Sequence, residues 1–137
     1  MTNPDCIFCK IVARELPATI VDEDELTVAF MDINPATRGH ALVVPRRHAQ
    51  DLLSIDPEDL CATAAAAQRL AGQMSERLGA TGINVLNSCG AAAWQTVFHF
   101  HLHVIPRYAD DPLRLPWTPT AGDASEIAAA AQELGRG

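Results

Sequence analysis

Three histidines recur at every second position in one apolar stretch, Val97-Phe-His-Phe-His-Leu-His-Val-Ile105. Side chains of a β-strand alternate between its two faces, so this spacing predicts that His99, His101 and His103 share one face. Twice the rise per residue would separate neighbouring imidazoles by about 7 Å. Imidazole serves as a nucleophile, a base or a metal ligand, so one small molecule on this face would meet several reactive groups.

A polar sheet face that carries histidine by chance is the alternative interpretation of this stretch. The chain has five histidines, and three of them lie within these five positions, which favours a shared role. The intervening apolar residues are predicted to form the buried side of the strand: Phe98, Phe100, Leu102 and Val104.

A second reactive pattern is Cys6-Ile-Phe-Cys9, at the start of a predicted short helix. Two thiolates at this spacing, together with two distant histidines, would fit tetrahedral zinc. Outside the strand the histidines are His40 and His48. Four protein ligands leave no open position for water, so such a zinc ion would be structural. A buried thiol pair without metal is the alternative.

The elements that must position these groups are short strands and three helices. Turn-forming residues and apolar runs predict strands over residues 18–22, 26–31, 41–44, 83–86 and 97–107, the first two of which form a hairpin. Together with one long helix they predict an α+β fold with a mostly antiparallel sheet of about five strands. We expect one domain over residues 1–137.

The helices are delimited by capping residues. Asp5 is the expected N-cap of a short helix over residues 6–13, and Asp56 that of a long helix over residues 57–78. A capping-box-like start at Asp123 predicts a last helix that ends near residue 135. The apolar stripe expected on the long helix comprises Leu60, Ala64, Ala67, Ala71, Met74 and Leu78.

Composition excludes some classes of partner. The formal net charge is −7, whereas a nucleic-acid-binding surface is basic, so no nucleic acid is expected. A site for a small phosphorylated ligand remains compatible with this charge. No apolar run is long enough to span a bilayer and no signal peptide is visible, so we expect no membrane partner and a cytoplasmic location.

The histidine stretch resembles the motif His-φ-His-φ-His-φ-φ of the histidine triad (HIT) family, where φ is apolar. Further blocks similar to that family follow in the same order, so the resemblance spans residues 6–108, whereas residues 109–137 are less diagnostic. It is most similar to the Hint-like, zinc-containing bacterial branch. The supporting blocks are Cys6-Ile-Phe-Cys-Lys-Ile11, Ala29-Phe-Met-Asp-Ile-Asn-Pro35, Gly39-His-Ala-Leu-Val-Val-Pro-Arg-Arg-His48 and Asn84-Val-Leu-Asn87.

The resemblance implies an enzyme that cleaves a nucleoside monophosphate, AMP above all, from phosphoramidates or dinucleoside polyphosphates. The middle histidine, His101, would attack the α-phosphorus and form a nucleotidyl-histidine that water then cleaves. His103 and Thr96 would contact the phosphate and assist the leaving group. Gln95 and Asn87 would hold phosphate oxygens as charge develops there.

The resemblance also implies the remaining ligand contacts and a homodimer. Asp32 would accept hydrogen bonds from the ribose hydroxyls, since a carboxylate suits a diol. His40 has no catalytic role in that pattern and would be structural. The slot for a purine base would be formed by Ile7, Phe8, Phe30 and Ile33, and the structural zinc would be held by Cys6, Cys9, His48 and His99.

One position departs from the family pattern. Many relatives have glycine before the glutamine, where this chain has Trp94, so the fit of the distal part of the substrate is open. The third histidine is retained, which favours the hydrolase branches. The role of residues 112–119, which include Trp117, is also open.

Two other functions fit parts of the pattern. A zinc-stabilised binding module would hold nucleotides without turnover, and His101→Ala would leave it largely unchanged. A metallohydrolase would bind a catalytic metal on the three strand histidines, and a chelator would abolish its activity quickly.

Overall fold

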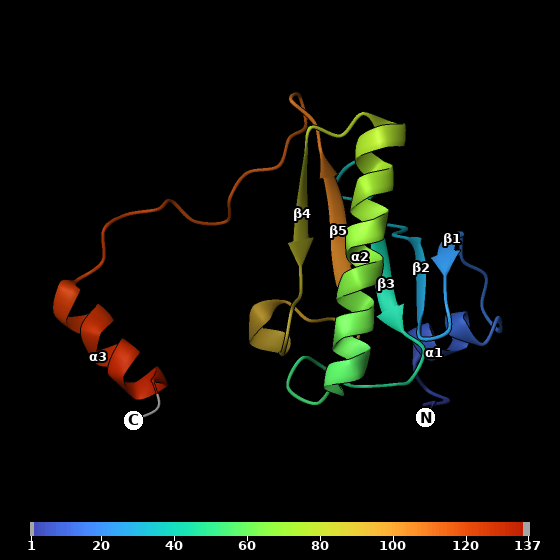
Figure 1. Cartoon of the computed structure of the whole chain (residues 1–137), viewed down its shortest axis with the longest axis horizontal. Helices are drawn as coiled ribbons and strands as arrows, with labels where there is room; N and C mark the ends of the chain where they lie inside the picture. Colours follow the sequence, from blue (N-terminus) through green and yellow to red (C-terminus); the bar gives the residue numbers. More distant parts are fainter. Residues whose placement is uncertain (1, 136–137) are drawn as a thin grey trace.

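The structure is a computed structural model, of which residues 2–135 are described. Five antiparallel strands form one sheet in the order β1-β2-β3-β5-β4 (Figure 1), which confirms the predicted α+β fold. The strands are β1 Ile20–Glu23, β2 Thr27–Met31, β3 Ala41–Pro45, β4 Gly82–Leu86 and β5 Leu102–Arg107. The helices are α1 Ile7–Val12, α2 Pro57–Leu78 and α3 Ala124–Leu134, with a short 3₁₀ helix at Ala91–Ala93.

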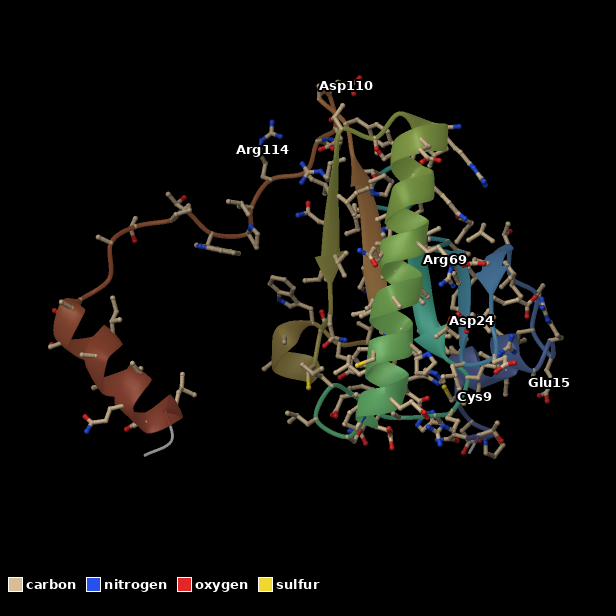
Figure 2. The ribbon with its side chains drawn as sticks, in the orientation of Figure 1. Cys9, Glu15, Asp24, Arg69, Asp110 and Arg114 are labelled. Atoms are coloured by element: carbon tan, nitrogen blue, oxygen red, sulfur yellow. The ribbon has the colours of Figure 1, made fainter. Side chains whose placement is uncertain are left out.

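The sheet buries apolar side chains on both faces. Helix α2 crosses one face (Figure 1), where Leu70 and Met74 pack in one cluster with residues of β3 and β5. On the other face, Phe8 of α1 packs with Phe30 and Leu42. Figure 2 shows Arg69 of α2 beside the β1–β2 hairpin, where its Nη2 lies 3.1 Å from Asp24 Oδ2.

The long helix has the predicted ends but a different buried stripe. Asp56 caps it by accepting from the Glu58 amide at 2.8 Å, and Gly79 ends it at a positive φ of 71°. Its buried residues are Asp59, Thr63, Ala66, Ala67, Leu70 and Met74. Of the predicted stripe, Ala64 is exposed, and Leu60, Ala71 and Leu78 are only half-buried. Alanine occupies many positions of α2, so hydrophobicity alone does not select the face that packs.

The first helix begins one residue later than predicted. Its N-cap is Cys6 rather than Asp5, because the Cys6 Sγ accepts from the Cys9 amide at 3.4 Å. This bond turns the Cys6 side chain inward, toward Cys9.

The last strand is shorter than predicted, and this shapes the site. β5 begins at Leu102, so His99 and His101 lie on an irregular segment before it, and Phe98 is exposed rather than buried. β3 pairs with β5 only as far as Val43 opposite Leu102. Pro45 has no N–H to continue this ladder. Its carbonyl instead lies 2.9 Å from His99 Nε2.

The carboxyl-terminal part leaves the sheet. Residues 111–123 have no regular secondary structure and lead to α3, which lies apart from the sheet (Figure 1). Asp123 caps α3 as predicted, with its Oδ2 3.0 Å from the Glu126 amide nitrogen. Within residues 2–135, no helix has both the length and the hydropathy to cross a membrane.

Candidate active site and metal centre

A pocket of about 490 Å³ opens between α1 and the β2–β3–β5 part of the sheet. Its volume is in the range of small-molecule sites. Among the residues expected to contact a nucleotide or act on it, those that line it are Ile7, Phe8, Phe30, Asp32, Ile33, Thr96, His101 and His103. Sequence reasoning missed the rest of the wall, which includes Ile11, Leu16, Pro17, Ala18, Leu42 and Val97.

One side of this pocket is an apolar slot. Phe8 and Phe30 are buried and meet edge to face, with ring centroids 5.3 Å apart. Ile33 stands at the mouth with 91% of its surface exposed. Apolar surface left open beside a pocket is typical of a place that a flat ligand covers. Asp32 lies beside Ile33, and its Oδ1 accepts from the Asn34 amide at 2.7 Å.

His101 is held in one tautomer by the backbone. Its Nδ1 lies 2.8 Å from the carbonyl oxygen of His99, which only accepts hydrogen bonds, so Nδ1 carries the proton. Nε2 then keeps its lone pair. Burial lowers the pKa of His101, which favours this neutral form. The Asn87 side-chain amide donates to the His101 carbonyl at 3.0 Å and steadies the same segment.

His103 is held by His40, a contact that sequence reasoning missed. The backbone amide of Ala36 donates to His40 Nδ1 at 2.9 Å, which places the proton of His40 on Nε2. That Nε2 lies 2.9 Å from His103 Nδ1 and donates to it. His103 therefore carries its own proton on Nε2. The register Leu42↔His103 between β3 and β5 brings the two rings together, and single-strand periodicity does not reveal that register.

Burial disfavours the charged forms of His40 and His103. Burial and the neighbouring histidines His101 and His40 lower the pKa of His103 to about 4. Burial also lowers the pKa of His40, although the nearby Asp32 carboxylate opposes this. The Asp32 Oδ2 lies 3.4 Å from His40 Nε2. Asp32, His40 and His103 form one of two clusters within the described chain whose donor atoms could hold a metal ion.

The three strand histidines do not converge on one point. His101 and His103 line the pocket with ring centroids 5.0 Å apart, closer than the predicted 7 Å. His99 is fully buried and turns toward the cysteines. Because His101 precedes the regular strand, the ideal strand spacing does not apply to it.

The second cluster joins Cys6, Cys9, His48 and His99. His99 Nδ1 lies 3.3 Å from Cys6 Sγ, 3.5 Å from Cys9 Sγ and 3.2 Å from His48 Nδ1, and His48 Nδ1 lies 3.4 Å from Cys9 Sγ. Zinc bonds of about 2.0–2.3 Å in a tetrahedron imply separations of roughly 3.3–3.8 Å between ligand atoms. The four donors therefore fit such an ion.

Two further contacts prepare these donors for a cation. The His99 Nε2–H donates to the Pro45 carbonyl, which leaves Nδ1 unprotonated toward the sulfurs. The Asn3 amide donates to Cys9 Sγ at 3.4 Å. Burial raises the pKa of Cys9, so without a cation this thiol stays protonated at neutral pH.

Two of the expected phosphate contacts lie outside the pocket wall. Gln95 is buried, and its side chain bonds the Gly90 amide at 2.7 Å and the Gln50 carbonyl at 2.8 Å. Asn87 supports the backbone of His101, and its Oδ1 is buried without a hydrogen-bond partner in the described part of the chain.

Trp94 also lies outside the pocket wall, with 65% of its surface exposed. Its φ is 75°, a left-handed conformation that favours glycine. The backbone thus gives a physical reason for glycine at this position in related chains.

The chain is similar in sequence and in structure to known proteins. The model of the HIT domain matches residues 13–110. An uncharacterized HIT-like protein of Borreliella burgdorferi is 44% identical over 110 residues, which are 78% of this chain and 78% of that protein. SMU.412c from Streptococcus mutans UA159 has a solved structure with a TM-score of 0.91 and 34% identity, covering 97% of this chain and 85% of that one.

Two other solved structures bear on the site. A zinc-bound histidine triad family protein from Mycobacterium smegmatis has a TM-score of 0.78 and 42% identity, over 94% of this chain and 95% of that one. A HIT family hydrolase from Clostridium thermocellum has a TM-score of 0.71 and 39% identity, over 83% of this chain and the whole of that one.

Proposed function

Since this chain belongs to the histidine triad family, we propose that it is a hydrolase that binds a purine nucleotide conjugate and releases the nucleoside monophosphate. The bond cleaved joins the α-phosphorus to nitrogen in a phosphoramidate or to oxygen in a dinucleoside polyphosphate. The name of the similar protein from Clostridium thermocellum supports hydrolysis.

The observation that carries this proposal is the tautomer of His101. Its proton lies on Nδ1 toward the His99 carbonyl, so the ring offers the Nε2 lone pair to the pocket. The apolar slot of Phe8, Phe30 and Ile33 would take the base, and the Asp32 carboxylate the ribose diol. A substrate held at both ends would present its α-phosphate to His101.

The reaction would proceed in two displacements. A bond forms from His101 Nε2 to the α-phosphorus as the bond to the leaving group breaks. The His103 Nε2–H and the Thr96 hydroxyl would donate to the phosphate oxygens or the leaving atom. Water then breaks the Nε2–P bond and releases the monophosphate. The proton that the leaving group takes up balances the one that this water gives up.

We further propose that Cys6, Cys9, His48 and His99 bind zinc, which would hold α1 against the segment before β5. The zinc-bound relative from Mycobacterium smegmatis supports this assignment. All four ligands come from the protein, so the ion would be structural and the chemistry would remain with the histidines. We also propose that two copies form a homodimer.

The test follows the covalent intermediate. The purified chain is mixed with adenosine 5′-phosphoramidate or diadenosine tetraphosphate, and AMP release is measured alongside the acid-quenched intact mass. We expect AMP and a transient adduct of one AMP unit, both missing in His101→Ala, with Cys61→Ser as an exposed control on α2.

Binding of AMP by calorimetry shows whether the variant keeps its pocket. Turnover by His101→Ala near the wild-type rate would contradict the nucleophile. Binding without turnover or adduct in the wild type would instead favour the nucleotide-binding module.

A further inference from the structure

Helix α3 is an amphipathic helix that packs against no other helix or strand among residues 2–135. Ile127, Ala131 and Leu134 recur at steps of four and three, so they form one apolar stripe. Ile127 is 59% exposed and Leu134 88% exposed. Within residues 2–135, α3 makes no hydrogen bond or ion pair with the sheet or with α2. An isolated helix of eleven residues is marginal in water, so α3 requires a docking surface.

The course of this arm recurs in a solved structure. Residues 109–137 are 29 of the 137 residues, so an alignment that covers 97% of the chain includes most of them. The TM-score of 0.91 to the Streptococcus mutans protein therefore includes an arm placed similarly relative to the sheet. Contacts among the described residues do not hold α3 at this place, which points to contacts with another molecule.

A matching apolar groove lies elsewhere on the surface. It has a volume of about 340 Å³ and lies between the carboxyl-terminal half of α2 and strands β1 and β2. The arm leaves the sheet on the β4 side, whereas β1 and β2 form the opposite end of the strand order (Figure 1). Its apolar walls are formed by Val21, Met31, Ala41, Leu70, Met74 and Leu78.

Charge complements shape at this groove. Arg77 lies on its wall and forms no ion pair within residues 2–135. Glu126 and Glu133 are seven positions apart on α3, so they flank one side of the apolar stripe. Neither glutamate has an ion pair among the described residues. A helix laid in the groove would bury its stripe and bring these carboxylates to the guanidinium.

We propose that α3 of one copy of this chain docks in the α2–β1–β2 groove of a second copy, so that two copies exchange their carboxyl-terminal arms. This goes beyond the proposed homodimer because it names the segment and the surface that join the subunits. It does not depend on the proposed chemistry.

The first test is the subunit dissociation constant from sedimentation equilibrium, referred to the chain mass of 14.7 kDa. We expect Ile127→Asp to raise this constant at least tenfold. Ala129→Asp adds the same charge on the opposite side of α3, and we expect it to stay within twofold of wild type. Arg77→Glu should weaken the dimer, and Glu126→Lys with Glu133→Lys should restore it. Circular dichroism checks that each variant folds.

The second test locates α3 directly. A photoreactive p-benzoylphenylalanine at position 134 should give covalent dimers whose cross-linked peptides map to Met74 or Leu78, whereas the same group at position 129 should not. Three results would overturn the proposal: a wild-type monomer at all concentrations, a dimer that Ile127→Asp leaves intact, or a cross-link within one chain.

Discussion

At the scale of single residues, hydrogen-bond direction decides what each histidine can do. The His99 carbonyl fixes the proton of His101, and the Ala36 amide fixes that of His40 and hence that of His103. Both sets begin at a backbone group of the protein itself, so they persist when no ligand is bound.

The depressed pKa of His103 predicts how stability depends on pH. Unfolded histidine titrates near 6.5, whereas His103 titrates at about 4 in the fold, so the unfolded chain binds more protons between these values. The contribution of His103 to the free energy of unfolding should therefore be constant above pH 7 and fall as pH drops from 6.5 to 4. We expect the free energy of unfolding of His103→Gln to fall less steeply over this pH window.

Urea unfolding at several pH values with constant metal, compared between wild type and this variant, measures both slopes. Equal slopes would contradict the assignment of this proton uptake to His103.

At the scale of elements, the sequence predicted the ends of α2 and α3 better than the side that α2 presents to the sheet. Asp56, Gly79 and Asp123 stand at the predicted helix ends because capping depends on local backbone groups. The buried side of α2 depends on the sheet it meets, which no local pattern contains. The same holds for His40, which reaches His103 only through strand register.

The observed register of α2 is testable with two equal substitutions. Ala66 is buried under the sheet, whereas Ala64 is exposed on the same helix. Leucine at position 66 overpacks the core, so Ala66→Leu should lower the free energy of unfolding by about 1–3 kcal/mol. Ala64→Leu should change it by less than about 0.5 kcal/mol. Chemical denaturation of both variants measures the difference. A larger loss of stability in Ala64→Leu than in Ala66→Leu would favour the buried stripe predicted from the sequence.

In the candidate site, too, the position of a residue was easier to predict than the partner of its side chain. Eight of the contacts that the family resemblance implied line one pocket, because they lie on segments whose order the family pattern preserves. The side chains of Gln95 and Asn87 instead bond backbone groups, Gln95 those of Gly90 and Gln50 and Asn87 that of His101. Sequence spacing carries no information on which partner an amide finds.

At the scale of the whole molecule, the proposed zinc site would join distant parts of the chain. Its donors would come from the N-cap and first turn of α1, from His48 three residues after β3, and from His99 before β5. Zinc bound only by the folded state at 1,000 times its dissociation constant would contribute about 4 kcal/mol.

Metal removal is therefore expected to destabilise the fold and to lower activity only through that loss of structure. A chelator should release one zinc ion per chain, lower the denaturation midpoint and reduce activity no faster than the fold is lost. Cys6→Ala should have the same effect without chelator. The measurements are metal content by atomic absorption, unfolding by circular dichroism and AMP release over time. Immediate loss of activity in a folded protein would favour a catalytic metal.

Phe8 lies in α1 between Cys6 and Cys9 and lines the pocket where we propose that the base binds. The residue proposed to contact the nucleoside thus lies between two of the proposed zinc ligands. Coupling between two sites is reciprocal, so an ion that orders Phe8 for the nucleotide must itself be held more tightly once the nucleotide is there. In a cell where zinc is scarce, copies occupied by substrate would keep their metal longest, and idle copies would be the first to yield it to other proteins.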